Sequence, residues 1–385
     1  MAKEKKNKEK DNDEEKETEV SPEAQMAGLL QDHKKNHYNF VKETNYKVSF
    51  GSLRLDKELG GLIPGVIRLA GRAEAGKTSE TLEIIDNHLR VPNRRACLFK
   101  AEGRLSKEMI ERTPVTFVWN AEEWKDQTCF VIETNNYNLT IDTMRRLVHN
   151  NPTGTQYLFA VDSMDALECE KDEERGAEET AMVGGNPTVT GLLLKKMNLA
   201  FIKLGHIGVF ISQYRSSGPT PKGAAPVKKT ANASGGYALE HYPNFVLEFL
   251  SPRKGDLITR NGGDADLVTN PFVGRWARVK VWKSPNEKTD YILSYPIKYG
   301  RKKASSVWRE KEVADCLIEM DYFTRKGAWF YWKQELELIK NLFAKFTNIE
   351  EKYNGEGKLH DFLEERPEVT EFLFDYFKNA FDTSI

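Results

Sequence analysis

The sequence contains little cysteine, no long apolar run and almost no net charge, and each shortage argues against a class of protein. Its four cysteines (Cys97, Cys129, Cys169 and Cys316) are scattered without a C-x-x-C pair, which argues against a disulfide framework or a thiolate zinc site. No apolar run reaches about 18 residues, so we expect no membrane partner, and the charged N-terminus lacks the apolar core of a secretory signal. The 57 basic and 58 acidic side chains balance, so any site for a polyanion must be a local patch. A reducing, cytoplasmic location fits these absences.

Composition changes along the 385 residues and divides them into parts. The first stretch is charged and has almost nothing to bury, which is typical of a disordered tail. Ser21 and Pro22 are typical of a helix start and predict a short helix that runs to about Lys35. We expect four parts: a tail (1–20), an N-terminal helical arm (21–47), a core (48–301) and a small, mostly helical C-terminal domain (302–385).

Short apolar runs rich in β-branched residues alternate with amphipathic stretches through the core. Alternation of this kind predicts an α/β fold with a mainly parallel, doubly wound sheet. Later apolar runs follow one another without intervening helical patterns, so we expect them to extend the sheet as antiparallel strands or hairpins. The parallel strands are predicted at 65–71, 96–101, 128–134, 157–162 and 208–213, the main helices at 140–149 and 189–205, and the antiparallel additions at 244–251, 275–282 and 290–297.

A phosphate-binding pattern, G-x-x-x-x-G-K-T, lies between a predicted strand and a predicted helix. It consists of Gly71, Arg72, Ala73, Glu74, Ala75, Gly76, Lys77 and Thr78. Glycines allow backbone N–H groups to curl around a phosphate, and the following helix adds its positive dipole end. Lys77 can reach the β- and γ-phosphates, and the Thr78 hydroxyl can bind Mg²⁺. The pattern predicts an ATP site, against the alternative of a helix cap with incidental glycines.

Three polar residues follow predicted parallel strands, whose carboxyl ends border the ligand crevice of an open α/β sheet. Asp162 ends the run YLFAVD and can serve as a metal carboxylate, or alternatively cap a turn. Glu102 follows ACLFKA and can orient or deprotonate a water molecule, while Gln213 ends VFISQ and can sense a γ-phosphate. Spacing alone leaves both of these roles open.

One long connection has a composition suited to nucleic acid. Residues 215–236 combine Gly, Pro, Ser and Ala with four basic side chains: Arg215, Lys222, Lys228 and Lys229. A flexible basic segment can follow a phosphate backbone, and the alternative is a solvated surface loop. The aromatic run Trp329–Trp332 is interpreted as packing within the C-terminal domain rather than as a platform for bases.

Taken in order, these segments resemble the RecA family of recombinases, including its phage-encoded UvsX-like members, from about Val48 to about Trp332. The resemblance rests on VIRLAGRAEAGKT, CLFKAEGRLS, LFAVDSMDAL, VFISQYR, ANASGGYALEHYPN, RVKVWK and IEMDYFTRKGAWFYW. It implies a P-loop ATPase core in which Glu102 is the catalytic glutamate, Asp162 the Walker B aspartate and Gln213 the γ-phosphate sensor. It also implies that Gly235 and Gly236 close the second DNA-binding loop, and that Lys283 reaches the nucleotide of a neighbouring subunit.

Three departures from the family pattern alter these expectations. Pro285 stands where the family has a second lysine, so that role is lost or moves to Lys288. Met109 stands where bacterial members place an aromatic against adenine. The first DNA loop, about Cys169–Pro187, is acidic here, which puts its contact with DNA in question.

The resemblance implies a DNA-dependent ATPase that requires ATP and Mg²⁺ and catalyses homologous pairing and strand exchange. Its partners would be single-stranded and double-stranded DNA, further copies of the chain in a helical filament, and single-strand-binding and loader proteins. Two alternatives keep the same fold: a hexameric DNA helicase, and a non-catalytic paralogue that acts as a mediator for a true recombinase.

Overall fold

The structure is a computed structural model, and its chain forms two compact units, Met1–Lys42 and Glu43–Ile385. In the first unit, α1 (Pro22–Asp32) begins where the Ser21 side chain accepts a hydrogen bond from the Ala24 N–H. The predicted helix is therefore present, although it ends before Lys35. The structure describes residues 21–34, 38–39, 41, 44–103, 105–168, 185–213, 238–260, 263–264, 266 and 268–382, with only the backbone for 185–190, 192 and 196.

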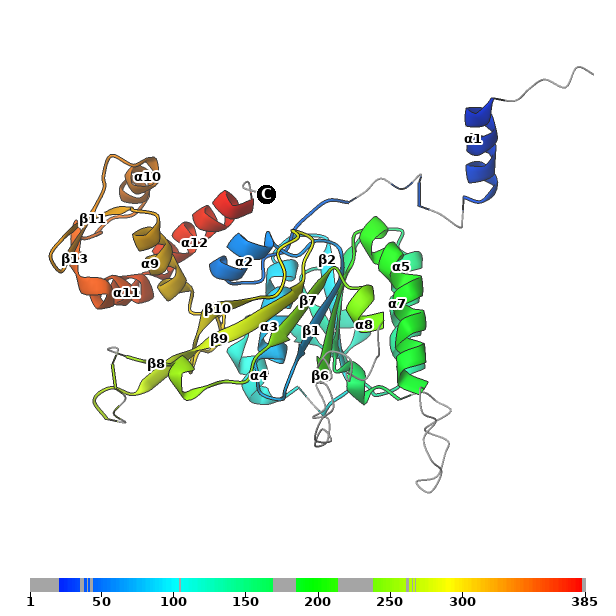
Figure 1. The fold of residues 1–385 in the computed structure, drawn as a ribbon, viewed down its shortest axis with the longest axis horizontal. Coiled ribbons are helices and arrows are strands. Elements are labelled where there is room, and N and C mark those ends of the chain that lie inside the picture. The colour runs from blue at the N-terminus through cyan, green and yellow to red at the C-terminus, as the bar shows by residue number, and fades with distance from the viewer. Residues whose placement is uncertain are drawn as a thin grey trace, which may run out of the picture. The chain divides into compact units, whose positions relative to one another are not determined.

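A ten-stranded mixed sheet forms the centre of the second unit (Figure 1). Neighbouring strands from β7 to β3 are parallel, and β9 and β10 are antiparallel additions, as predicted. The short strand β8 (Leu257–Thr259) pairs with β9 off this path. The strand order is β10 (Tyr291–Lys298), β9 (Phe272–Lys283), β7 (Phe245–Phe249), β1 (Gly65–Gly71), β6 (Ile207–Gln213), β5 (Gln156–Asp162), β2 (Arg94–Lys100), β4 (Cys129–Glu133) and β3 (Phe117–Val118).

The direction of β7 corrects one prediction. The run 244–251 was expected to be antiparallel, but β7 pairs parallel to β1, with Ile67 opposite Phe245. A parallel neighbour needs a crossover of about a dozen residues or more, and the connection from Gln213 to Phe245 supplies it. This connection also contains α8 (Ala238–His241), a short helix that the hydrophobic pattern did not reveal.

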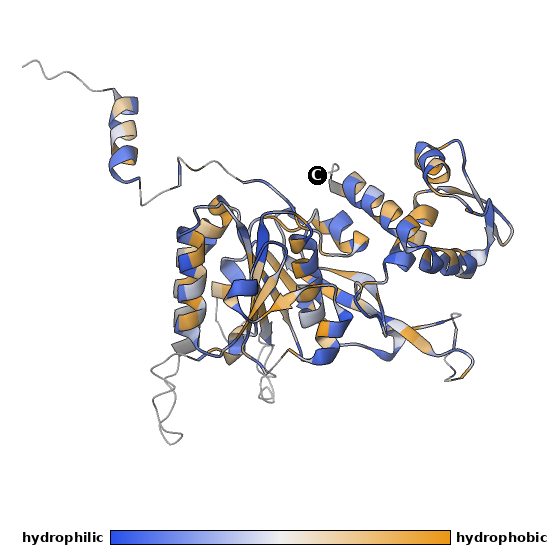
Figure 2. Ribbon diagram, turned by 180° about the vertical axis from the view of Figure 1, so that it is seen from behind, coloured by the Kyte–Doolittle hydropathy of each residue, from blue (hydrophilic) through white to orange (hydrophobic). Residues whose placement is uncertain are grey.

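Helices cover both faces of the sheet (Figure 1). On one face, Ile67 and Leu69 of β1 share a buried cluster with Ile84 of α3 (Lys77–Leu89). On the other face, Phe159 of β5 stacks on Phe201 of α7 (Gly185–Leu204), with ring centroids 5.7 Å apart. The remaining helices of this region are α2 (Leu53–Leu59), α4 (Lys107–Arg112) and α5 (Tyr137–His149). Apolar residues gather along the central strands (Figure 2), as expected for a sheet buried on both faces.

The C-terminal part has its own buried cluster, which also includes Leu53 of α2. Besides its helices it contains an antiparallel three-stranded sheet that the sequence analysis did not predict. Alternation along the strand β12 (Trp329–Trp332) buries Phe330 and Trp332 but leaves Trp329 38% exposed, so packing explains only part of the aromatic run. Its elements are α9 (Arg309–Glu319), β11 (Phe323–Lys326), β12 (Trp329–Trp332), α10 (Glu337–Lys345), β13 (Lys352–Asn354), α11 (Gly355–Glu365) and α12 (Pro367–Asp382).

Within the part of the chain that the structure describes, every helix is too short or too polar to cross a bilayer.

Candidate active site

The segment Gly71–Thr78 connects β1 to α3 at the carboxyl edge of the sheet. Gly71 has a φ of 143°, and a Cβ atom there would lie 2.4 Å from the carbonyl oxygen of Phe249 on β7. Gly76 caps α3 with a φ of 111°. Both positions therefore favour glycine because of their positive φ, and at Gly71 the backbone also passes close to a neighbouring strand. Arg72, Ala73 and Glu74 are exposed, and Ala75 is buried.

Lys77 is held inside this loop. Its ammonium group donates hydrogen bonds to the carbonyl oxygens of Gly71 at 3.0 Å and Arg72 at 2.6 Å, and the residue is 6% exposed. Burial lowers the pKa of the amine, while the carboxylates of Asp162, Glu102 and Asp165 act in the opposite direction. The loop therefore holds one ammonium group at its centre, and this cation is suited to receiving the negative charge of a phosphate.

Asp162 accepts two hydrogen bonds on the same carboxylate oxygen. The Thr78 hydroxyl donates to its Oδ2 at 3.1 Å, and the Lys100 ammonium group lies 2.7 Å from that atom. Lys100 and Asp162 end neighbouring strands and are register partners across β2 and β5. A hydroxyl and a carboxylate are oxygen ligands of the kind Mg²⁺ prefers, completed in nucleotide sites by phosphates and water. The residue types at this position therefore fit a Mg²⁺–nucleotide site.

Glu102 lies at the exposed rim of the same edge. Its Oε1 accepts from the Ser163 hydroxyl at 2.7 Å, and the Gln213 side-chain amide donates to both carboxylate oxygens at 2.8 and 2.9 Å. The backbone N–H of Gln213 donates to Asp165 at 2.5 Å. Gln213 is also the register partner of Gly71, so the end of β6 lies next to the start of the phosphate loop. The structure thus brings together Lys77, Thr78, Glu102, Asp162 and Gln213.

Lys283 lies apart from this group. It ends β9, where its ammonium group donates to the carbonyl oxygen of His241 at 2.6 Å, and burial lowers its pKa. Lys288 lies 3.5 Å from a carboxylate oxygen of Glu58. Contact with the nucleotide of a neighbouring subunit, for either lysine, stays a prediction.

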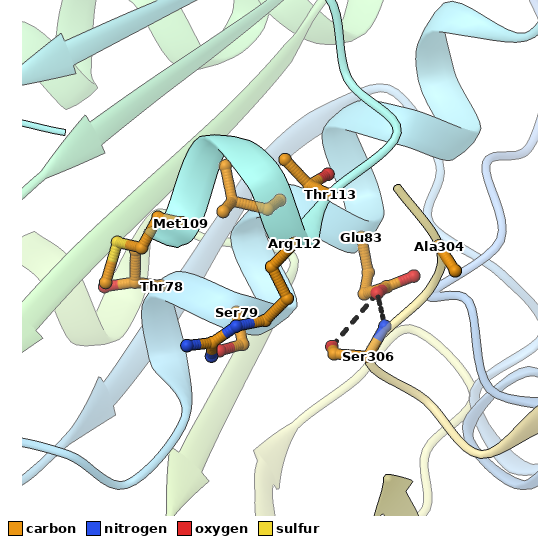
Figure 3. A pocket seen from close by; sticks show the side chains of 9 residues that line it. Thr78, Ser79, Glu83, Met109, Arg112, Thr113, Ala304 and Ser306 are labelled. Atoms are coloured by element: carbon orange, nitrogen blue, oxygen red, sulfur yellow. Dashed lines mark hydrogen bonds between the residues drawn. The ribbon is translucent and has the colours of Figure 1, made fainter. Parts of the chain in front are cut away.

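A pocket opens beside Thr78, between α3 and α4 (Figure 3). Met109, which the family resemblance places near the base, lies next to Thr78 in this pocket, and Arg112 lies next to Ser79. On its far side, Glu83 accepts hydrogen bonds from the backbone N–H and the hydroxyl of Ser306. The lining residues are Thr78, Ser79, Leu82, Glu83, Met109, Arg112, Thr113, Ala304 and Ser306.

The predicted DNA-binding residues lie outside the described part of the chain. This holds for Arg215, Lys222, Lys228, Lys229, Gly235 and Gly236, and for residues 169–184 of the first loop. The end of that predicted loop, residues 185–187, belongs to α7.

The described part of the chain contains another surface whose chemistry suits nucleic acid. On the three-stranded sheet, the Lys352 ammonium group lies 4.6 Å from the ring centroid of Trp329 and 5.4 Å from that of Tyr331. Lys326 lies 5.3 Å from the Tyr331 ring. Cations that can pair with phosphates therefore lie beside rings on which bases can stack.

Three polar residues at the sheet edge were missed by the sequence analysis. Lys100 stands as a charged residue within the apolar run ACLFKA, directly before the strand ends, and this was the signal that could have identified it. Ser163 and Asp165 follow Asp162 in the run VDSMD. Their hydrogen bonds to Glu102 and Gln213 depend on the neighbouring strands and have no signature in the sequence.

The chain has recognisable relatives, although no protein-family model matches it. It is 25% identical over 344 residues to "Protein RecA" of Listeria seeligeri, covering 85% of this chain and 89% of the relative. It is 26% identical over 291 residues to "Protein RecA" of Bacillus thuringiensis, covering 75% of each. "DNA repair protein recA homolog 1, chloroplastic" of Arabidopsis thaliana is 26% identical over 289 residues, covering 74% of this chain and 58% of the relative. These relatives are bacterial and chloroplast proteins, so the phage-type resemblance stays a prediction.

Proposed function

We propose that the chain is an ATP-dependent DNA recombinase, on the basis of its similarity to RecA proteins. In this proposal it assembles as a filament on single-stranded DNA and catalyses homologous pairing and strand exchange with duplex DNA. It hydrolyses ATP as a DNA-dependent ATPase. We expect it to act in the cytoplasm of a bacterial cell or of a phage-infected host.

The observation that carries the proposal is the hydrogen-bonded pair of Glu102 and Gln213 at the edge of the phosphate loop. A carboxylate that is 2.8 Å from the amide of Gln213 can hold a water molecule near a γ-phosphate bound by the same loop. Gln213 is the last residue of β6, and the segment predicted to bind DNA follows it in the chain. A change in the contacts of Gln213 on ATP binding would therefore act directly on the start of that segment.

The residues of the phosphate loop and of the neighbouring strand ends have separate roles in hydrolysis. Lys77 exchanges its two carbonyl partners for phosphate oxygens, and the backbone N–H groups at the start of α3 point toward the same phosphates. Thr78 and Asp162 would hold Mg²⁺, which neutralises phosphate charge when bound. Glu102 accepts a proton from the water molecule that attacks the γ-phosphorus, and the bond from that phosphorus to the bridging oxygen breaks, so that ADP leaves. The side chain of Gln213 fixes the orientation of the Glu102 carboxylate.

Filament assembly requires a contact between unlike surfaces of successive copies. A contact of that kind that does not close produces a helix instead of a ring. We assign one side of the contact to the arm that contains α1, whose described residues are not buried and include the exposed Met26 and Leu29. We assign Lys283 to the neighbouring subunit's nucleotide, as the family resemblance implies. Single-strand-binding and loader proteins are further proposed partners.

Measurement of ATP hydrolysis with and without single-stranded DNA tests the proposal, together with Lys77→Ala. This substitution should reduce hydrolysis to background because it removes the cation of the loop, and the fold should persist because the two carbonyl oxygens can bind water instead. Lys107→Ala is the control, since it removes an exposed lysine from the start of α4. Hydrolysis by Lys77→Ala at the wild-type rate would contradict the assignment.

Negative-stain images with an ATP analogue separate the proposal from its alternatives. Open helical filaments that lengthen on single-stranded DNA support a recombinase, whereas closed rings would indicate a helicase. A chain that binds ATP but shows no DNA-stimulated hydrolysis would be a mediator paralogue.

A further inference from the structure

Lys100 forms a buried ion pair inside the proposed nucleotide site. Its ammonium group lies 2.7 Å from Oδ2 of Asp162, and the two side chains are 8% and 5% exposed. Thr78 donates to the same oxygen. Of the two proposed ligands of Mg²⁺, Asp162 is therefore already paired with a cation that belongs to the chain, at the oxygen that accepts from Thr78.

The position of Lys100 is fixed by the sheet and not by a flexible loop. It is the last residue of β2, paired in register with Asp162 on one side and with Glu133 of β4 on the other. Burial of two charges costs solvation that their attraction does not reliably recover, so stability alone is a weak reason for such a pair. Lys100 also lies two residues before Glu102 in the chain, at the edge of the sheet where the loop would present the phosphates.

We propose that Lys100 is a built-in counter-cation of the nucleotide site, which competes with the divalent cation for Asp162. Where the metal is scarce, Lys100 neutralises Asp162 and its positive charge supports the bound phosphates. Where the metal is abundant, the metal shares or displaces the ammonium group at Oδ2. This inference rests on the proposed function, because it assumes that Thr78 and Asp162 face the phosphates of a bound nucleotide.

Competition for one oxygen makes a measurable prediction about coupling between metal and nucleotide. The coupling is the ratio of the nucleotide dissociation constant in EDTA to that in saturating Mg²⁺. By thermodynamic linkage, bound nucleotide changes the affinity for Mg²⁺ by the same factor. In wild type this ratio should be small, because Lys100 partly replaces the metal. Lys100→Met keeps the length and apolar stem of the side chain without its charge, so the ratio should rise by roughly tenfold, and the Mg²⁺ concentration needed for half-maximal binding should fall.

The experiment is equilibrium binding of a fluorescent ATP analogue to the full-length chain, in EDTA and across a Mg²⁺ titration. Lys107→Met is the matched control, because it removes the same charge from an exposed position nearby in the sequence. Lys100→Arg retains a cation and should keep the wild-type ratio. Thermal unfolding identifies variants that do not fold, and Lys100→Gln replaces Lys100→Met if the latter fails.

Each outcome decides the matter. A wild-type ratio in Lys100→Met, or an equal rise in Lys107→Met, would overturn the role of Lys100. If no neutral variant folds, the wild-type protein still decides: loss of nucleotide affinity in EDTA by far more than roughly tenfold overturns the proposal, and retention supports it. A chain that binds no nucleotide under any condition, or binds it equally well as Lys77→Ala, would instead contradict the proposed function.

Discussion

Two groups of three carboxylates lie in the same compact unit, and their surroundings differ. Glu102, Asp162 and Asp165 lie at the carboxyl ends of parallel strands or directly after them. Each accepts hydrogen bonds from side chains or backbone of neighbouring strands and turns, and Asp162 also meets a lysine. Glu102 reaches the exposed rim. These acids are placed where a ligand can meet them.

The second group, Glu80, Glu83 and Glu312, is almost entirely buried. Burial raises the pKa of Glu80 well above its ordinary value, although the Tyr295 hydroxyl donates to it at 2.7 Å and acts against that rise. Glu83 accepts hydrogen bonds from Ser305 and Ser306. These bonds connect α3 with strand β10 and with the segment that leads into the C-terminal part.

Glu312 makes a similar connection at the other end of that segment. It projects from α9 and accepts hydrogen bonds from the Ser52 hydroxyl at 2.5 Å and the Leu53 N–H at 2.8 Å, at the start of α2. The position of an acid relative to the strand ends, more than its burial or charge, therefore separates groups suited to chemistry from groups that join distant segments. Substitutions in the first group should therefore change rates, and substitutions in the second should change stability.

The largest expected effect is on the rate of hydrolysis. Glu102→Gln removes the proposed proton acceptor and keeps the shape of the side chain, so hydrolysis should fall between about a hundredfold and ten-thousandfold. Binding of ATP and DNA should be preserved, because the amide can still accept from Ser163. Single-turnover hydrolysis and nucleotide binding, measured on the same preparation, check the expected loss of rate and the expected retention of ATP binding.

The free energy of unfolding supplies the control for this variant. It should change by less than about 0.5 kcal/mol, as for other substitutions on the protein surface. Hydrolysis within a few-fold of wild type would move the base to another residue. A large loss of stability in Glu102→Gln would show that Glu102 also stabilises the fold, as the buried second group of carboxylates is expected to do.

Glu83→Ala tests the second group of carboxylates, and here we expect a loss of stability where Glu102→Gln loses catalytic rate. It leaves two serines without their acceptor and removes one of the two carboxylates near Arg309, which lies 3.9 Å from Glu83 and 3.5 Å from Glu371. Loss of one partner from a buried charged network costs about 3–5 kcal/mol. Urea unfolding should register that loss, whereas Glu122→Ala, at an exposed position, should leave stability nearly unchanged. Equal stability of the two variants would show that the Glu83 contacts do not join the segments.

The sequence was sufficient to predict most of the parallel core and several of the polar residues at its edge. Apolar runs alternating with helical patterns specify a parallel sheet, and its geometry then gathers Lys77, Asp162, Glu102 and Gln213 without further information. Lys100 was missed because a lysine in a strand is ordinarily explained as an edge or surface residue. Its ion pair with Asp162 depends on β2 lying next to β5, and the order of the strands in the sheet cannot be predicted from the sequence of either strand.

Other features escaped prediction because they arise from distant contacts. The direction of β7 follows from the long crossover and from pairing with β1. The three-stranded sheet consists of strands of three or four residues, too short for a pattern of period two to be distinguished from helix or turn. Within it, the split between buried Phe330 and exposed Trp329 follows only once the strand is known.

The smallest expected effect concerns the pH dependence of stability at Glu312. Burial raises the pKa of this carboxyl from 4.5 to about 7, against the opposing effect of the Ser52 and Leu53 hydrogen bonds. The folded protein therefore binds its proton more tightly than the unfolded chain does. The stability contributed by this proton is complete below about pH 4.5 and is lost as the pH rises through about 7.

Glu312→Gln does not titrate and can satisfy both neighbours, because its amide oxygen accepts from Leu53 while its amide nitrogen donates to the Ser52 hydroxyl. Its stability relative to wild type should therefore rise by up to about 3 kcal/mol between pH 4.5 and pH 8, at about 1.4 kcal/mol for each unit of pKa difference. Urea unfolding of both proteins across this range measures the difference, and Glu319→Gln, on the same helix but more exposed, controls for the change in net charge. Parallel pH profiles for wild type and Glu312→Gln would mean that burial does not raise the pKa of this acid in the folded protein. Glu312 would then resemble the carboxylates at the sheet edge, and the contrast between the two groups would rest on Glu80 and Glu83 alone.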